Sequence, residues 1–248
     1  MKDIKVVVNG AGGRMGREVV KAVSGTPGMS VAAAVDRGSF ASDVPAYTSL
    51  SDVKEECDVI IDFSHHTAAE SVISFALSRG IPAVIATTGH TEEERRLITD
   101  ASKKIPIFFS ANMSVGIALL IVLTKTAVKA FPDADVEIVE IHHNNKLDVP
   151  SGTALMLAEA VKDVRRDVIF RIGRHENGKR LPEEVGIHSL RLGNTVGIHE
   201  IIISTANQTV TIKHEAHNRA LFADGAVCAA KFIVGLPAGL YTVSDMIN

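Results

Sequence analysis

The sequence of 248 residues contains no tryptophan, and only 4% of its residues are aromatic. Base stacking needs aromatic side chains, and binding to a phosphate backbone needs an excess of positive charge. Because the formal net charge is -3, we expect no nucleic-acid partner. The sequence also lacks an apolar run near the ~20 residues that cross a bilayer, so we expect no membrane partner.

Cysteine is scarce as well. Cys57 and Cys228 are the only two, and they lack the close pairing of a zinc site. We expect them to be reduced thiols, as in a cytosolic protein. A strand-like run begins at residue 4, where a signal peptide would need a longer lead, and we therefore predict a cytoplasmic protein.

Short apolar runs rich in β-branched residues recur through the first part of the chain. Near-continuous apolar strands are typical of a parallel sheet whose two faces are covered by crossover helices. We therefore predict an α/β, Rossmann-like, doubly wound domain. Its predicted strands are 4–10, 29–36, 57–64, 81–88 and 106–112.

A different pattern follows the fifth run. Residues 114–131 predict a long helix, 135–143 a strand and 153–163 an amphipathic helix. Residues 168–216 alternate apolar and polar side chains, which is typical of antiparallel strands. This part of the chain predicts an α+β domain with a mainly antiparallel or mixed sheet.

The end of the chain reads as helical again. Residues 219–236 predict a helix that returns, with the tail, to the first domain. The predicted domains are therefore 1–113 together with 217–248, and 114–216.

Residues 10–16, Gly-Ala-Gly-Gly-Arg-Met-Gly, directly follow the first predicted strand and open a helix-like segment. This is the G-x-G-x-x-G pattern, whose glycines allow a tight turn and a close approach of backbone to pyrophosphate. Asp36 ends the second predicted strand, where a carboxylate accepts from ribose hydroxyl groups. A purely conformational glycine turn and a solvated strand end are the alternatives. The combination favours dinucleotide binding.

Arg37 bears on the choice of nucleotide. Its guanidinium can pair with the 2′-phosphate of NADP, which Asp36 alone would repel. The sequence therefore permits NADH or NADPH.

Polar residues end the fourth and fifth predicted strands, at 86–88 and 110–113. Because the carboxyl ends of parallel strands face the ligand crevice, we expect both loops to line the nicotinamide half of the site. Ordinary loop polarity is the alternative. His65 and His66 follow the third predicted strand, and we expect them at the cofactor edge or on the surface rather than in catalysis.

A second polar stretch, EIHHNNKLDVPSGTA, occupies residues 140–154. Ser151-Gly152-Thr153 begins a predicted helix, and such a turn offers N–H groups and hydroxyls to a carboxylate. Lys146 adds a mobile positive charge and a proton source, and His142 and His143 add imidazoles, which ordinarily titrate near neutral pH. Together they predict a site for an anionic substrate that is protonated during the reaction.

Simpler alternatives exist for each of these features. Ser151 can act as a helix cap alone. Adjacent histidines on a strand point to opposite faces, so one of the pair can be merely packed or solvated. A metal pair is disfavoured, because no cysteine or third clustered histidine follows at ligand spacing.

The stretches GAGGRMG, EIHHNNKLDVPSGTA and FADGAV (222–227), in this order, closely resemble the 4-hydroxy-tetrahydrodipicolinate reductase family, also called dihydrodipicolinate reductase. The resemblance covers essentially the whole chain. It implies reduction of a cyclic imine dicarboxylate to tetrahydrodipicolinate with NADH or NADPH, on the route to diaminopimelate and lysine. It also implies a homotetramer whose centre is formed by the sheets of the second domain, which then serves substrate binding and oligomerisation.

The resemblance also implies residue roles. His142 matches the proton donor or acceptor and Lys146 the proton donor, while His143, Gly152 and Thr153 match substrate-binding positions; the helix-start argument adds Ser151. The matching cofactor positions are Gly10, Ala11, Gly12, Gly13, Arg14, Met15, Asp36, Arg37, Ala86, Thr87, Thr88, Ser110, Ala111, Asn112 and Met113.

Three positions depart from the family pattern. Asp36 is shorter than the glutamate often found there, Ala86 replaces a frequent glycine and Met113 replaces a frequent aromatic residue. The first loosens the ribose contact and the others alter nicotinamide packing, but no reacting group is lost. Two other functions stay open: a dehydrogenase of another amino acid or semialdehyde, and a non-catalytic dinucleotide-binding sensor derived from a reductase.

Overall fold

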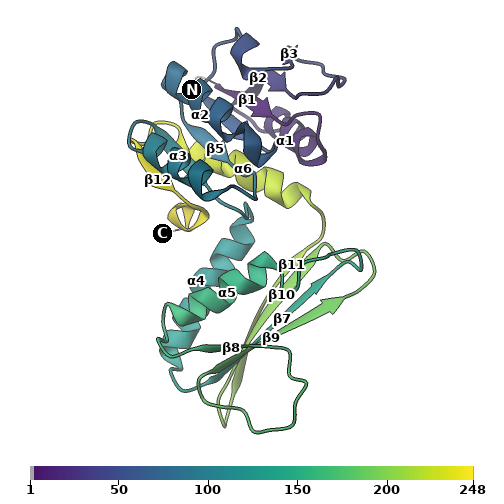
Figure 1. Ribbon diagram of the computed structural model, residues 1–248, viewed down its shortest axis with the longest axis vertical. Coiled ribbons are helices and arrows are strands. Elements are labelled where there is room, and N and C mark those ends of the chain that lie inside the picture. The colour runs from purple at the N-terminus through teal and green to yellow at the C-terminus, as the bar shows by residue number, and fades with distance from the viewer. Residues whose placement is uncertain (1–2, 248) are drawn as a thin grey trace. The chain divides into compact units, whose positions relative to one another are not determined.

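The computed structural model describes residues 3–247 and divides them into two compact units (Figure 1). Residues 3–114 and 219–247 form unit 1, and residues 115–218 form unit 2. The predicted boundaries lie one residue earlier at the first junction and two residues earlier at the second. No helix among the described residues is both long and apolar enough to cross a membrane.

Unit 1 contains one parallel sheet with the strand order β12-β6-β5-β4-β1-β2-β3 (Figure 1). The order runs outward in both directions from the pair β1 and β4, so the topological switch point lies at their carboxyl ends. The predicted doubly wound α/β fold is confirmed. The strands are β1 (Ile4–Asn9), β2 (Met29–Val35), β3 (Ala46–Tyr47), β4 (Val59–Asp62), β5 (Ala83–Ile85), β6 (Pro106–Phe109) and β12 (Gly239–Tyr241).

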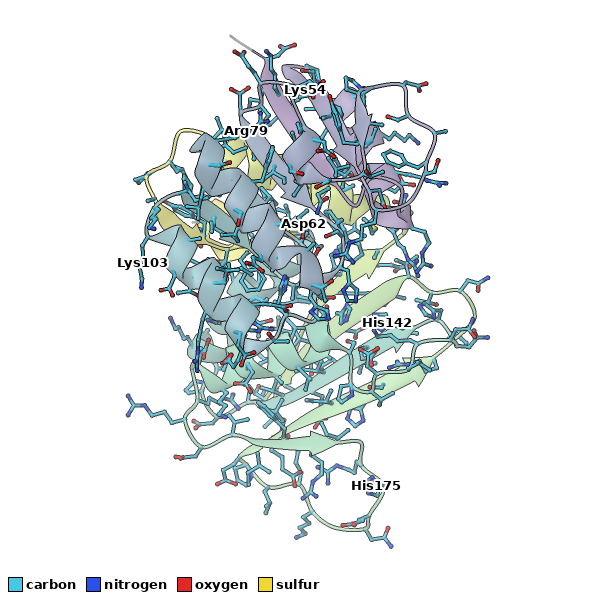
Figure 2. All side chains as sticks on the ribbon, turned by 45° about the horizontal axis from the view of Figure 1, so that its top comes forward. Lys54, Asp62, Arg79, Lys103, His142 and His175 are labelled. Carbon is cyan, nitrogen blue, oxygen red and sulfur yellow. The ribbon has the colours of Figure 1, made fainter. Side chains whose placement is uncertain are left out.

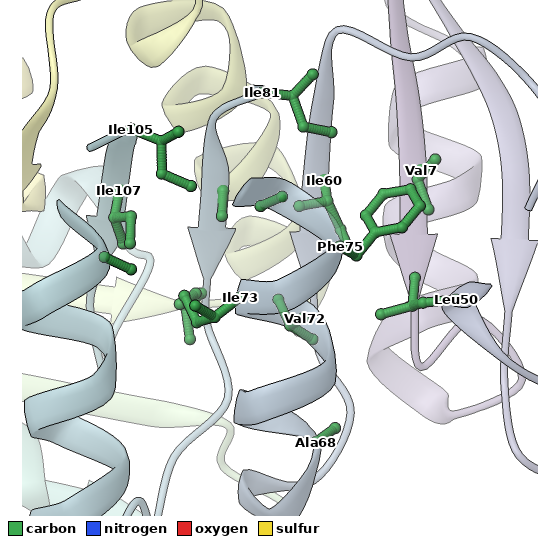
Figure 3. Packing of buried hydrophobic residues seen from close by; sticks show 14 of the residues in the cluster. Val7, Leu50, Ile60, Ala68, Val72, Ile73, Phe75, Ile81, Ile105 and Ile107 are labelled. Atoms are coloured by element: carbon green, nitrogen blue, oxygen red, sulfur yellow. The ribbon is translucent and has the colours of Figure 1, made fainter. Parts of the chain in front are cut away.

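Helices cover both faces of this sheet. Helices α1 (Arg14–Ser24) and α6 (Ala220–Ile233) pack together on one side, and α2 (Ala69–Arg79) and α3 (Glu92–Ser102) on the other. Figure 3 shows part of the core beneath α2, where Val72 and Phe75 lie over the strands that carry Val7 and Ile60. Burial on both faces is the reason that the strands are apolar throughout.

Unit 2 has a five-stranded mixed sheet in the order β11-β10-β7-β9-β8. Helices α4 (Val115–Ala130) and α5 (Gly152–Lys162) pack on one face, over alternate residues such as Val136 and Ile138. The strands are β7 (Asp135–His142), β8 (Ile169–Ile172), β9 (Glu184–Arg191), β10 (Gly197–Ser204) and β11 (Thr209–Ala216).

The mixed sheet confirms the predicted α+β domain with a mainly antiparallel or mixed sheet, but the antiparallel interpretation of residues 168–216 is wrong for two of their strands. Strands β10 and β11 are antiparallel, and β10 is antiparallel to β7. However, β9 runs parallel to β7, and β8 runs parallel to β9. Alternating polarity identifies a strand with one buried face, but it does not specify the direction in which the strand runs.

Candidate functional site

The glycine loop of unit 1 is packed too closely for side chains. Gly10 has φ +81°, and a Cβ atom there would lie 2.5 Å from the carbonyl oxygen of Phe63. A Cβ atom on Gly16 would overlap the carbonyl oxygen of Gly10. Gly13 is the N-cap of α1 and supplies no side-chain cap, so the first amide groups of the helix remain available to an anion. This loop fits a dinucleotide pyrophosphate.

Asp36 is held against the glycine loop at the carboxyl end of β2. Its Oδ2 atom accepts a hydrogen bond from Gly12 N at 2.9 Å, and its Oδ1 atom accepts from Gly38 N at 3.2 Å. Arg37 donates from Nη2 to Thr67 Oγ1 at 3.3 Å. The carboxylate therefore lies against the glycine loop, and the guanidinium of the next residue reaches Thr67.

Two cavities lie along the carboxyl ends of these strands. The first, of about 320 Å³, is lined by Gly10, Gly13, Asp36 and Arg37 among the predicted cofactor residues. The second, of about 470 Å³, is lined by Arg14, Met15, Ala86, Thr87, Thr88, Ala111 and Met113. Phe63 and Ser64 line both, so the two cavities adjoin. Ala11, Gly12, Ser110 and Asn112 line neither cavity.

Those four residues shape the loops instead. Ala11 is buried, and Gly12 donates its N–H to Asp36. The Ser110 hydroxyl donates to the carbonyl of Asn112 at 2.7 Å, which closes the turn after β6.

Sequence reasoning missed several residues that line the cavities. Phe63 and Ser64 directly follow β4 at the switch point. The rule that ligands bind at a switch point could have identified them from the sequence. The segment near Thr48 follows β3, whose two residues are too short to show any pattern. His65 lines the first cavity, and His66 binds Glu94 through Nδ1 at 2.9 Å. The missed lining residues are Asn9, Val35, Thr48, Ser49, Leu50, Phe63, Ser64, Ala68, Ser71 and Phe222.

A buried carboxylate, Asp62 (labelled in Figure 2), joins three of the strand ends that border the cavities. Its Oδ1 atom accepts from Asn9 Nδ2 at 2.7 Å and from the Ser64 hydroxyl at 2.6 Å. Its Oδ2 atom accepts from the Thr87 hydroxyl at 2.7 Å. One carboxylate thus fixes side chains at or just beyond the ends of β1, β4 and β5.

In unit 2, His142 (labelled in Figure 2) is buried at the end of β7 and donates from Nδ1 to Glu140 Oε2. Glu140 is two residues earlier on the same face and has no exposed surface. Both of its oxygens also accept from Arg191, through Nη1 and Nη2 at 3.0 Å each. A fourth hydrogen bond comes from Ser151 N at 3.2 Å.

The surroundings set the charges of these groups. Burial by itself raises the pKa of Glu140, but the hydrogen bonds donated by His142 and Arg191 outweigh it and lower the pKa to about 2. Glu140 is therefore an anion at neutral pH. Burial, and then the nearby His142, lower the pKa of His199 to about 3, so that ring is neutral. The rings of His142 and His199 meet edge to face, with centroids 5.1 Å apart.

The loop after β7 carries the other predicted substrate residues. Lys146 Nζ lies 2.8 Å from Asp148 Oδ1, and Arg191 Nη2 donates to the carbonyl of Asp148 at 2.7 Å. His143 follows β7 and is half-buried, and its carbonyl accepts from Lys146 N at 3.1 Å. Asp148 thus links Lys146 to Arg191, the residue that also binds Glu140.

The Ser151-Gly152-Thr153 turn begins α5 as predicted. The Ser151 hydroxyl accepts from Ala154 N at 3.2 Å, which is a helix cap, and it also pairs with His199 Nε2 at 3.2 Å. A Cβ atom on Gly152 would meet nothing within 4 Å, so the first turn is open at that point. The arrangement offers a helix N-terminus and a cation to a carboxylate, and an imidazole backed by a carboxylate to a reacting proton.

Glu140, Arg191 and His199 were missed from the sequence. A glutamate two residues before a strand histidine lies on the same face of the strand, and this spacing was the available signal. Arg191 and His199 lie 49 and 57 residues after His142, and nothing in the local pattern connects them to it.

The fold and the first cavity define a two-domain protein with a Rossmann-like nucleotide-binding unit. Residues 4–113 match the family model "Dihydrodipicolinate reductase, N-terminus", and residues 116–247 match "Dihydrodipicolinate reductase, C-terminus". The chain belongs to the dihydrodipicolinate reductase family and is an oxidoreductase. The predicted resemblance is confirmed.

Individual relatives match over nearly their full length. The chain is 47% identical to the 4-hydroxy-tetrahydrodipicolinate reductase of Caldanaerobacter subterraneus subsp. tengcongensis, over 99% of this chain and 98% of that protein. It is 40% identical to the Clostridium tetani enzyme of the same name, over 99% and 97%. The solved structure of dipicolinate-bound dihydrodipicolinate reductase from Paenisporosarcina sp. TG-14 superposes with a TM-score of 0.83, at 27% identity and 97% coverage of each chain.

Proposed function

We propose that the protein reduces 4-hydroxy-tetrahydrodipicolinate, by way of dihydrodipicolinate, to tetrahydrodipicolinate in diaminopimelate and lysine biosynthesis. The full-length similarity to reductases of that name carries the proposal. The chemistry of unit 2 supports it, because a dicarboxylate ring that gains a proton needs cations, helix-start amides and a proton-transferring group. The cytoplasm is the proposed location, and the free thiols of Cys57 and Cys228 fit a reducing compartment.

The cofactor proposed for unit 1 is NADH or NADPH. The nicotinamide supplies the hydride when it is bound. The glycine loop would hold the pyrophosphate, Asp36 and Arg37 the adenosine ribose, and the second cavity the nicotinamide half. The residues proposed for these roles are Gly10, Ala11, Gly12, Gly13, Arg14, Met15, Asp36, Arg37, Ala86, Thr87, Thr88, Ser110, Ala111, Asn112 and Met113.

We expect both nucleotides to work, with NADH preferred by less than roughly tenfold, because Asp36 repels a 2′-phosphate and Arg37 attracts it. Arg37→Ala is expected to weaken NADPH selectively and so to widen the preference. The measurement is KM for each nucleotide at saturating substrate and low ionic strength, because salt screens the phosphate contact. Equal weakening of both nucleotides would show that Arg37 does not read the 2′ position.

Substrate is proposed to bind to unit 2. The amide of Gly152 and the charge of Lys146 would hold carboxylate groups, with His143 and Thr153 beside them. Ser151 would contribute by capping the turn, since its hydroxyl already pairs with Ala154 and His199. Lys146 or His142 would supply the proton, and Glu140 would stabilise positive charge on His142 while it holds the proton.

A homotetramer is the proposed assembly. The sheet face of unit 2 that faces away from α4 and α5 carries half-buried Val139, Ile141, Ile198 and Ile202. The same face also carries Glu137 and Glu200, so its apolar part is a patch, and such a patch is suited to burial against copies of the same chain.

The test is an anaerobic assay with the purified protein, freshly generated 4-hydroxy-tetrahydrodipicolinate and either nucleotide. Loss of nucleotide absorbance that requires both the protein and the substrate is the expected result. Turnover only with another amino acid or semialdehyde would indicate a different dehydrogenase. Nucleotide binding without any turnover would indicate a sensor.

A further inference from the structure

The Glu140 carboxylate occupies an unusual position for a charged group. It has no exposed surface, and moving a carboxylate out of water is costly unless its oxygens are fully hydrogen-bonded. Four donors satisfy it: His142 Nδ1, both terminal nitrogens of Arg191, and Ser151 N. The bidentate Arg191 pair fixes the plane of the carboxylate, because the two parallel hydrogen bonds allow only one orientation.

The Glu140 carboxylate also decides which nitrogen of a neutral His142 ring carries the proton. A carboxylate anion can only accept hydrogen bonds, so the proton of a neutral His142 ring must lie on Nδ1. The other nitrogen, Nε2, then carries the lone pair or the transferable proton. Among residues 3–247 no hydrogen bond engages Nε2. Gly197 leaves space beside this nitrogen, because a Cβ atom at that position would lie only 3.1 Å from Nε2.

The charged and titratable groups around His142 come from three further elements. Arg191 of β9 is a fixed cation that binds Glu140, and His199 of β10 is neutral and packs against the ring. Lys146 of the following loop binds Asp148, whose carbonyl also accepts from Arg191. Glu140 is the only group among these that bonds directly to the His142 ring.

We propose that Glu140 and Arg191 are positioning residues for His142: Arg191 orients the Glu140 carboxylate, and the carboxylate holds His142 with its proton on Nδ1 and Nε2 directed to the substrate. The inference rests on the proposed function for its kinetic consequence. Its structural consequence, the position of the ring proton, does not depend on any reaction.

The primary test is histidine nitrogen NMR at about pH 8, above the usual range of imidazole titration. Protein labelled with ¹⁵N-histidine is compared with Glu140→Gln, and the His142 signals are assigned by their loss in His142→Gln. We expect the wild type to be protonated on Nδ1 and Glu140→Gln to shift population to the Nε2-protonated form. An unchanged tautomer in Glu140→Gln would overturn the proposal.

The kinetic test uses the same variants. Glu140→Gln is expected to lower kcat/KM for the substrate roughly ten- to a hundredfold, within the range for a lost acid–base contribution, and to leave KM for NADH nearly unchanged. Arg191→Lys keeps the charge but loses the paired geometry, and we expect a smaller loss. Because the effect acts through His142, adding Glu140→Gln to His142→Gln should change kcat/KM by less than about twofold. Equal losses in both backgrounds would contradict the positioning role.

Glu184→Gln is the matched control. Glu184 is also a buried carboxylate of this sheet that is paired with arginines, Arg171 and Arg174. It lies on β9 five residues before Ser189, the partner of Glu140 in the β7–β9 register, which is roughly 16 Å along the strand. We expect wild-type kinetics, and a loss equal to that of Glu140→Gln would show a general effect of lost ion pairs. A wild type without reductase activity would refute the proposed function, while the NMR comparison would still decide the role of Glu140.

Discussion

Lys146 is a partly buried cation in a loop whose backbone is tied down. Its side chain is 21% exposed, whereas that of its partner Asp148 is 60% exposed. The ion pair lowers the pKa of Asp148, and the carbonyl of Asp148 is bound to Arg191. The ammonium group of Lys146 is therefore held in a defined position, as a carboxylate-binding group requires.

Lys146→Ala is expected to lower kcat and raise KM for the substrate together, with little change in KM for NADH. Loss of a charge-assisted contact is worth roughly 1.5–3 kcal/mol, so kcat/KM should fall about ten- to a hundredfold. The control is Lys125→Ala, which removes an ion pair of the same unit, that of Lys125 with Asp163. Near-wild-type kcat/KM in Lys146→Ala would show that Lys146 neither binds the substrate nor supplies the proton.

His199 gives unit 2 a pH dependence whose sign is fixed by its lowered pKa. The ordinary value is 6.5, and the folded value is about 3. Below pH 6.5 the unfolded chain therefore binds a proton that the folded chain does not, and stability falls as the pH falls toward 3. His199→Gln keeps a polar partner for Ser151 but cannot titrate.

Between pH 7 and pH 5 the wild type is expected to lose about 2 kcal/mol more of its free energy of unfolding than His199→Gln, from 1.36 kcal/mol per pH unit below the unfolded value. Urea unfolding followed by circular dichroism at both pH values measures the difference. Parallel losses in the two proteins would mean that His199 does not carry this dependence.

At the scale of elements, the carboxyl ends of β1, β4 and β5 are joined by a single side chain. Asp62 ends β4 and binds Asn9, Ser64 and Thr87. Ser64 lines both cavities, Asn9 lines the first and Thr87 lines the second. The shape of the proposed dinucleotide site therefore depends on this buried carboxylate as well as on the glycine loop.

Asp62→Asn replaces one of the two acceptor oxygens by an amide donor, so that either the Thr87 hydroxyl or the Asn9 amide and the Ser64 hydroxyl lose their acceptor. Leaving buried hydrogen-bonding groups unpaired costs roughly 1–3 kcal/mol, and we expect NADH to bind about tenfold or more weakly, as measured by the rise in NADH fluorescence. Asp58→Asn is the control, because Asp58 lies before the opposite end of β4 and binds Lys5 N. Equal binding by both variants would show that Asp62 does not shape the site.

At the scale of the whole molecule, the sheet face of unit 2 that faces away from α4 and α5 carries half-buried apolar residues from two strands, β7 and β10. Along β7 and β10 these half-buried residues alternate with the buried residues that pack on α4 and α5, so each strand contributes side chains to both faces of the sheet. Ile198 lies opposite Ile141 in the β10–β7 register, which places both in one patch.

Ile141→Lys adds a charge to this patch between two apolar neighbours, Ile198 and Leu190, and is expected to dissociate the proposed tetramer, because a buried unpaired charge is strongly unfavourable. Light scattering after size exclusion should give four times the chain mass of 26.4 kDa for the wild type and a smaller assembly for the variant. Thr126→Lys, on the exposed surface of α4, is the control. A monomeric wild type would refute the assembly.

Local patterns determined much of this protein. The glycine pattern at 10–16 predicted the turn after β1, because Gly10 and Gly16 occupy positions where a side chain would collide with backbone. Continuous apolar runs predicted the parallel sheet, since both faces of such a strand must be buried. The Ser151 helix start followed from capping chemistry, which acts within four residues.

Tertiary structure decided what lies far apart in the chain. Glu140 meets Arg191 and His199 only because β7 lies between β9 and β10 in a particular register. The direction of β9 depends on this pairing, and the three strand ends that Asp62 joins depend on the strand order of the other sheet. Local propensity acts over a few residues, whereas the partners of a buried charge are chosen by the way distant strands pair, and no short stretch of sequence contains that information.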